Sequence, residues 1–155
     1  MQKLLESLNL ARSETIIQRY QCWAVPGSSL NIESEARIAA ITRPDIVIAK
    51  SIGTRIAIYA YTGKLMSAKT CILLGIPVRG CSNDEISALQ EICANVPTLL
   101  IQQTDDPAGS FSVVTSMIPH SPTCQISEVP GNDHRYGNID ELRQIIESWY
   151  PGRGT

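Results

Sequence analysis

Apolar positions along the chain fall into short continuous runs, which are separated by longer segments with helical spacing. The runs at residues 46–48 and 71–74 are apolar at every position. Such runs are typical of strands that are buried on both faces of a parallel sheet. The pattern predicts five strands, at residues 16–24, 45–50, 69–76, 98–103 and 124–129.

The segments between these runs carry the spacing of helices. Ser82 and Glu85 form a capping-box sequence ahead of an apolar stripe, and Pro97 ends that helix. Stripes also occur at residues 32–42 and 138–150, and residues 52–60 are apolar on nearly every face, so this helix should be central. The alternation predicts an α/β fold: a mostly parallel sheet of about five strands with helices on both faces. We expect one domain, residues 1–155.

Charge and composition limit the expected partners. The 155 residues carry a formal net charge of −2 and are 43% hydrophobic, as expected for one soluble domain with a core. This balance gives no reason to expect nucleic acid or an anionic membrane surface as a partner. No stretch approaches the ~20 apolar residues that span a bilayer, and the N-terminus does not resemble a signal peptide. A cytoplasmic location is therefore expected.

The cysteines favour neither disulfides nor zinc. There are five of them, an odd number, and no pair has Cys-x-x-Cys spacing. Cys71 and Cys93 lie in apolar segments and are interpreted as small buried hydrophobic residues. We expect the protein to need no metal or organic cofactor.

One serine lies between a predicted strand and a predicted helix. Ser51 follows the second run directly, with Ala49 two residues before it and Gly53 two residues after it. This layout is typical of a nucleophile elbow, a strained turn that leaves little room for side chains at those two positions. The usual pattern has glycine where this chain has Ala49. The alternative interpretation is a buried serine that caps the following helix.

Polar residues that could assist Ser51 follow two later strands. Asp105 and Asp106 come after the fourth predicted strand, and His134 comes after the fifth. The carboxyl ends of parallel strands meet at one edge of a sheet, so these groups should lie close to Ser51. A serine hydroxyl needs a base such as His134, and an adjacent carboxylate fixes the tautomer of that base. His120 is expected on the surface and Asp133 in a turn.

In its motifs the chain resembles the α/β-hydrolase superfamily, especially small serine hydrolases without a lid. The resemblance rests on residues 48–54, 102–110 and 131–134, in the order serine, aspartate, histidine. It implies a catalytic triad of Ser51, His134 and Asp106, where Asp106 is preferred to Asp105 because the family's acid directly precedes a proline. It also implies that the amide of Ile52 binds the oxyanion.

The resemblance further implies that N-terminal strands of the family, which usually has eight, are missing here. The first predicted strand, residues 16–24, then has two placements. It is either the family's fourth strand, with residues 1–9 as the preceding helix, or the third, in which case Gly27 lies in the loop that provides the second oxyanion amide. Sequence similarity favours the first placement and sheet continuity favours the second.

The function expected from these features is hydrolysis of small carboxylic esters or thioesters. The alternative is a non-catalytic or split hydrolase-like module that forms a homodimer, or pairs with a complementing chain, at an exposed sheet edge. A doubly wound binder of anions through residues 25–29 is less favoured, because the chain lacks a glycine-rich phosphate motif. Lys50 and Arg55 flank the elbow and are interpreted as solvated charges rather than as determinants of acidic substrates.

Overall fold

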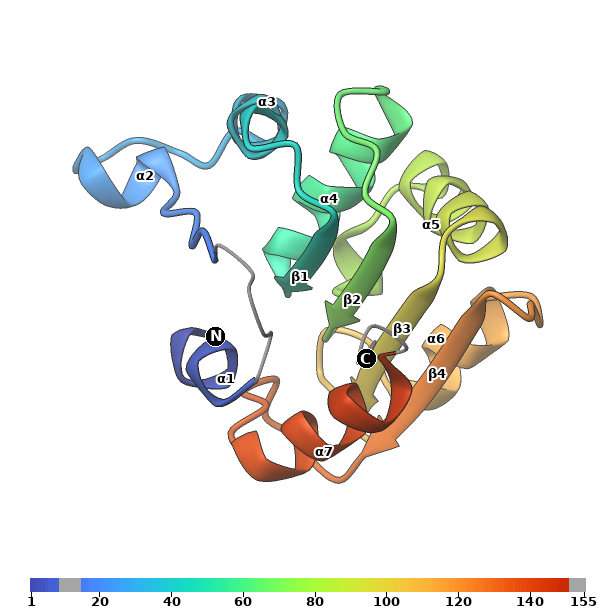
Figure 1. The fold of residues 1–155 in the computed structure, drawn as a ribbon. Coiled ribbons are helices and arrows are strands. Elements are labelled where there is room, and N and C mark those ends of the chain that lie inside the picture. Colours follow the sequence, from blue (N-terminus) through green and yellow to red (C-terminus); the bar gives the residue numbers. More distant parts are fainter. Residues whose placement is uncertain (9–14, 151–155) are drawn as a thin grey trace, which may run out of the picture.

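The computed structural model describes residues 1–8 and 15–150. Its described residues form a four-stranded parallel sheet in the order β1-β2-β3-β4 (Figure 1). The strands are β1 (Ile46–Lys50), β2 (Thr70–Leu74), β3 (Thr98–Gln103) and β4 (Cys124–Val129). The last four predicted strands are thereby confirmed. β2 and β3 are buried at every position, in line with their continuous apolar runs.

Helices cover both faces of the sheet, as the sequence predicts (Figure 1). The three connections between neighbouring strands contain α4 (Ile52–Thr62), α5 (Asn83–Asn95) and α6 (Phe111–Met117), with a single 3₁₀ turn, η1 (Val78–Gly80), before α5. These helices share one core cluster, because crossovers of one hand between successive strands fall on one face. The second face is covered by α1 (Gln2–Ser7) and α7 (Ile139–Trp149).

The helix that follows β1 is central to the fold. Ala57 and Ile58 of α4 belong to the cluster on the sheet, whereas Ile56 and Ala60 pack with Ala36 of α3 (Ile32–Ile41). α4 therefore lies between the sheet and α3, as its nearly uniform apolar character predicts. The sheet and α3 hold α4 from two sides, and Ser51, the residue before α4, belongs to the candidate site.

The first predicted strand is wrong. Residues 15–20 have no regular secondary structure, and α2 (Gln21–Ala24) is a short helix. The apolar side chains of Ile16 and Ile17 are exposed. The physical reason is the buried carboxylate of Glu35 on α3, which accepts hydrogen bonds from the Gln18 side chain at 2.7 Å and the Gln21 amide at 2.6 Å. These bonds hold the segment against α3 instead of beside β1.

This correction removes the strand on which both family placements depended. In the described residues, β1 pairs with β2 alone and is an edge strand. The helix expected within residues 1–9 is present as α1, whereas Asn9 lies outside the described residues.

Several local predictions are confirmed. Ser82 and Glu85 form the capping box of α5, and Glu85 also holds Arg55 of α4 through two hydrogen bonds. Cys71 and Cys93 are buried in the main core, and His120 is exposed. Burial raises the pKa of the Cys71 thiol to about 11.

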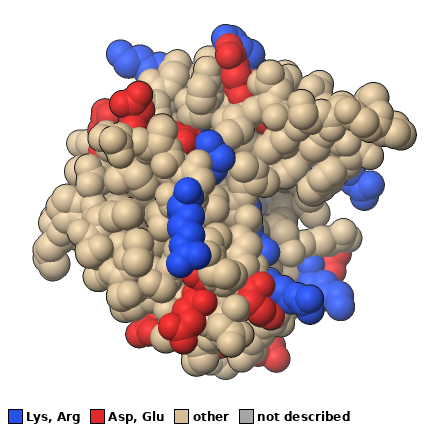
Figure 2. Space-filling view, turned by 180° about the vertical axis from the view of Figure 1, so that it is seen from behind, with Lys and Arg blue, Asp and Glu red and all other residues tan. Residues whose placement is uncertain are grey.

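The surface carries charges of both signs. On the face shown in Figure 2, basic and acidic side chains lie next to one another. None of the helices in the described part of the chain is long and apolar enough to cross a membrane.

Candidate active site

The carboxyl ends of the strands bring the predicted residues together. Ser51 directly follows β1, Asp106 follows β3 by three residues, and His134 follows β4 by five residues. Ser51 Oγ lies 2.7 Å from His134 Nε2, and His134 Nδ1 lies 2.8 Å from both carboxylate oxygens of Asp106. Three groups from distant parts of the sequence thus form one continuous hydrogen-bonded chain.

The backbone at Ser51 has the strained geometry of an elbow. Its φ of 54° and ψ of −123° lie in a region that residues with a side chain rarely adopt. The turn is held on both sides, because the Ser51 amide donates to the Leu74 carbonyl at 2.9 Å and the Ser51 carbonyl accepts from the amide and hydroxyl of Thr54. The Ser51 side chain makes no cap hydrogen bond to α4, so the helix-cap interpretation does not hold.

Gly53 leaves room for a neighbour that the sequence did not indicate. A β-carbon at this position would lie 2.8 Å from the Tyr20 hydroxyl but 3.8 Å from the Ala49 methyl, which is an ordinary contact. The tight neighbour is therefore the segment before α2 rather than the strand end. This segment places the Tyr20 phenol beside the first turn of α4.

The proton positions in the chain follow from the chemistry of its members. A carboxylate can only accept, so the Asp106 side chain requires the hydrogen of His134 on Nδ1. His134 Nε2 then carries a free lone pair that accepts the Ser51 hydroxyl proton. This is the tautomer that a general base needs in order to activate the serine.

Asp106 is buried, whereas its neighbour Asp105 is exposed. The Asp106 carboxylate is fully enclosed, and besides His134 it accepts the Ala108 amide at 2.8 Å and the Tyr136 hydroxyl at 2.7 Å. Hydrogen bonds of this kind offset the cost of burying a charged carboxylate. Asp105 makes its described hydrogen bond through its backbone amide, to Gly131.

Two residues at the site were not identified from the sequence. Gln103, the last residue of β3, accepts the amide of His134 at 2.9 Å with its side-chain oxygen and donates to Asp133 Oδ1 at 3.1 Å. Tyr136 accepts the Gln103 amide at 2.9 Å with its hydroxyl. Asp133 also accepts the Arg135 amide, as expected of a turn residue. The available signal for Gln103 was a polar residue at the end of a fully buried strand.

The backbone of the loop after β4 is unusual at two residues. His134 and Tyr136 have φ values of 59° and 57°, in the left-handed region. Gly131 has a φ of 151°, and a β-carbon there would overlap the Gln103 side chain. The loop therefore depends on Gln103 as a template, and its geometry aims His134 toward Ser51.

Gly75 supports the site from β2, although no motif marks it. It directly follows β2 with a φ of 60°, and a β-carbon there would lie 2.6 Å from Tyr136 Cε2 and 3.1 Å from His134 Cε1. Glycine is needed both for the left-handed backbone and for the close approach of two rings.

Replacement of Gly75 by alanine is therefore expected to destabilise the fold by about 2–4 kcal/mol through backbone strain and overpacking. For the hydrolysis proposed below, it should also lower kcat by about 100-fold, because His134 must move. Thermal unfolding and ester hydrolysis measure the two effects. Gly137→Ala is the matched control, since the space around Gly137 is open. Wild-type stability and kcat in Gly75→Ala would contradict this description of the site.

The two candidate oxyanion donors, the backbone amides of Ile52 and Gly27, differ in their position relative to Ser51. Ile52 is the first residue of α4, so its amide has no acceptor within the helix and remains available beside Ser51. Gly27 lies in an exposed turn after α2, with a φ of 81° and open space around it. The described interactions include none between Gly27 and Ser51, and the oxyanion role of Gly27 stays a prediction.

The charged residues beside the elbow have partners. The Lys50 ammonium lies over the Tyr136 ring, 5.7 Å from its centroid, and Arg55 is paired with Glu85 at 2.7 Å. The solvated charge expected from the sequence is therefore wrong for Arg55, which is ion-paired across to α5.

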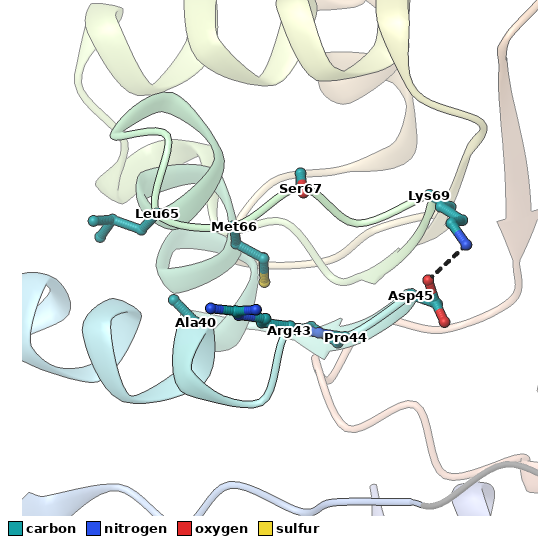
Figure 3. A pocket seen from close by; sticks show the side chains of 8 residues that line it. All are labelled: Ala40, Arg43, Pro44, Asp45, Leu65, Met66, Ser67 and Lys69. Atoms are coloured by element: carbon teal, nitrogen blue, oxygen red, sulfur yellow. Dashed lines mark ion pairs between the residues drawn. The ribbon is translucent and has the colours of Figure 1, made fainter.

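A hollow of about 430 Å³ lies away from this chemistry (Figure 3). Its lining includes Pro44 and Asp45, which precede β1, and Lys69, which precedes β2. It is therefore at the amino ends of the strands, opposite to Ser51. The ion pair between Asp45 and Lys69 at 3.0 Å is exposed. Within residues 1–8 and 15–150 there is no cluster of three metal-ligating side chains.

Comparison with known proteins agrees with this architecture. A family model described as an alpha/beta hydrolase domain matches residues 26–143, more than half of the chain. The chain is also similar to a solved structure of a thermophilic esterase, with a TM-score of 0.51 and 12% identity over 91% of this chain and 78% of that one. At this identity the likeness concerns the fold alone. No curated protein matches the chain. On the strength of the family match, the chain belongs to the alpha/beta hydrolase domain family.

Proposed function

We propose that the protein is a serine hydrolase that cleaves small carboxylic esters or thioesters through Ser51, His134 and Asp106. The observation that carries the proposal is the unbroken chain from Ser51 Oγ through His134 to the buried Asp106 carboxylate, with heavy-atom distances of 2.7 Å and 2.8 Å. The strained backbone at Ser51 supports it, because strain that the surrounding fold maintains is concentrated at functional sites.

In the proposed reaction, Ser51 Oγ attacks the acyl carbonyl carbon while His134 Nε2 takes the hydroxyl proton. The carbonyl oxygen becomes an oxyanion, which the Ile52 amide stabilises. His134 then protonates the leaving alcohol or thiol, and an acyl-serine remains. Water, activated by the same imidazole, releases the carboxylic acid and restores Ser51.

The rate depends on the oxyanion site. One donor, the Ile52 amide, is assigned, and a second is not. Loss of one such donor lowers turnover by roughly 10²–10³ in other hydrolases. We therefore expect a modest kcat. The short connection between β2 and α5, residues 75–82, leaves little chain for a lid, which favours small or surface-presented acyl groups.

The wild-type protein is expected to hydrolyse p-nitrophenyl acetate and butyrate faster than buffer, with a preference for these over the palmitate ester. Release of p-nitrophenol measures the rate, and a heat-unfolded sample is the control for general nucleophiles. A folded protein without acceleration on oxygen esters or on the corresponding thioesters would contradict the proposal. It would favour the alternative of a non-catalytic module, for which the edge position of β1 in the described residues is the supporting observation.

A further inference from the structure

Tyr136 lies behind the Asp106 carboxylate and takes no direct part in the proposed reaction. Its side chain is 4% exposed, and its hydroxyl lies between two groups, the Gln103 backbone amide at 2.9 Å and Asp106 Oδ2 at 2.7 Å. A backbone amide can only donate, so it occupies a lone pair of the phenol oxygen. The phenol hydrogen is thereby directed to Asp106. Burial, together with the hydrogen bond to Asp106, raises the pKa of Tyr136, and the phenol remains a donor.

The carboxylate could otherwise rotate about its own axis. The Ala108 amide donates to Oδ1, the Tyr136 hydroxyl donates to Oδ2, and the His134 ring nitrogen is equally distant from both oxygens at 2.8 Å. The two fixed donors on opposite oxygens determine the plane of the carboxylate. His134, which contacts both oxygens, then has its ring orientation determined by that plane.

The surroundings of Tyr136 hold the phenol in this place. The edge of its ring meets the His134 ring at an interplanar angle of 80° with centroids 6.0 Å apart, and Gly75 lies closely against it. The Lys50 ammonium covers its face. Strands β1, β2 and β3 thus all contribute to the position of one hydroxyl group.

From these contacts we propose that Tyr136 is a positioning residue. Its hydroxyl fixes the Asp106 carboxylate and competes with the Nδ1–H of His134 as a hydrogen-bond donor to the carboxylate oxygens. The inference rests on the proposed function for its effect on catalysis. Tyr136→Phe should lower kcat by about 10- to 100-fold with little change in KM, because the phenol does not touch substrate. In an Asp106→Asn background the same change should have almost no effect, since the two residues act as one unit.

A readout that does not require activity is the downfield ¹H NMR signal of the His134 Nδ1–H. In Tyr136→Phe the carboxylate loses a competing donor, so its hydrogen bond to His134 strengthens and the signal should move downfield. A 3-fluorotyrosine at position 136 is a stronger donor and keeps the hydroxyl, so the signal should move upfield. This second variant serves if Tyr136→Phe does not fold. Tyr61→Phe, at the end of α4 distant from Ser51, is the control and should leave the signal unchanged.

The results separate the two proposals. A chain that is inert on esters but shows both shifts would overturn the proposed function and retain the role of Tyr136 as a partner of Asp106. An active enzyme in which neither Tyr136 variant moves the signal, and in which Tyr136→Phe has wild-type kcat, would overturn the positioning role alone.

Discussion

Ser51→Ala is expected to lower kcat on short acyl esters by about 10⁴–10⁶-fold. The physical reason is that, among the described residues, Ser51 Oγ is the hydroxyl oxygen hydrogen-bonded to the His134 imidazole, so its removal takes away the atom that accepts the acyl group. KM should change little, because the lost hydroxyl acts mainly in the transition state. The measurement is steady-state hydrolysis, followed with enough enzyme to detect a residual rate.

The matched control for this substitution is Ser116→Ala. Ser116 is exposed on α6, and its hydroxyl donates to the Val113 carbonyl on its own helix. This variant should retain wild-type kcat. Because alanine keeps the β-carbon of serine and the turn is held by backbone hydrogen bonds to Leu74 and Thr54, Ser51→Ala should remain folded, with a thermal stability close to that of wild type. A Ser51→Ala protein that is folded and fully active would mean that another group performs the reaction.

Asp106→Asn is expected to lower kcat by about 10⁴-fold. An amide in this position can donate to His134 Nδ1, which would place the ring hydrogen on Nε2. Nε2 would then point a hydrogen at the Ser51 hydroxyl instead of a lone pair. The buried network would also lose its charge, which the Ala108 amide and the Tyr136 hydroxyl now stabilise. Ester hydrolysis and circular dichroism together separate lost chemistry from lost folding.

Asp105→Asn provides the control for the same chemical change one residue away. Asp105 is exposed, and its described bond is made by the backbone, so kcat should stay within about twofold of wild type. The sequence alone left the choice between the two aspartates to a resemblance. Equal losses in both variants, or a loss confined to Asp105→Asn, would refute the assignment of Asp106.

The sheet was predictable because its two central strands are buried on both faces and contain continuous apolar runs, at residues 71–74 of β2 and 99–101 of β3. The helix between these strands, α5, has a clear apolar stripe and a capping box. The segment at residues 16–24 has a similar density of apolar residues, yet it is not a strand. Its conformation is determined by Glu35, a charged residue buried on a helix, and a local pattern does not reveal such a long-range bond.

The part of the candidate site that follows the ends of strands was predictable from the sequence. Ser51, Asp106 and His134 each follow a strand end, so sheet topology alone brings them close. The supporting residues are different in kind. Gln103 and Tyr136 act through a loop with left-handed residues, and Gly75 acts by leaving space, so that their roles appear only when the side chains are placed. The sequence indicated that Gly53 must be small because of crowding at the turn. The close neighbour is instead the Tyr20 hydroxyl, which the local pattern did not place there.

The proposed reaction depends on Ser51 as a nucleophile that His134 activates. Incubation of the folded protein with a fluorophosphonate probe, followed by mass spectrometry of the labelled peptide, tests this activation without any choice of substrate. We expect covalent label on Ser51 in the wild type, much slower labelling in His134→Ala, and no label in Ser51→Ala or in heat-unfolded wild type. Absence of label on Ser51 in the folded wild type, or equal labelling of the Ser51→Ala protein, would contradict this expectation.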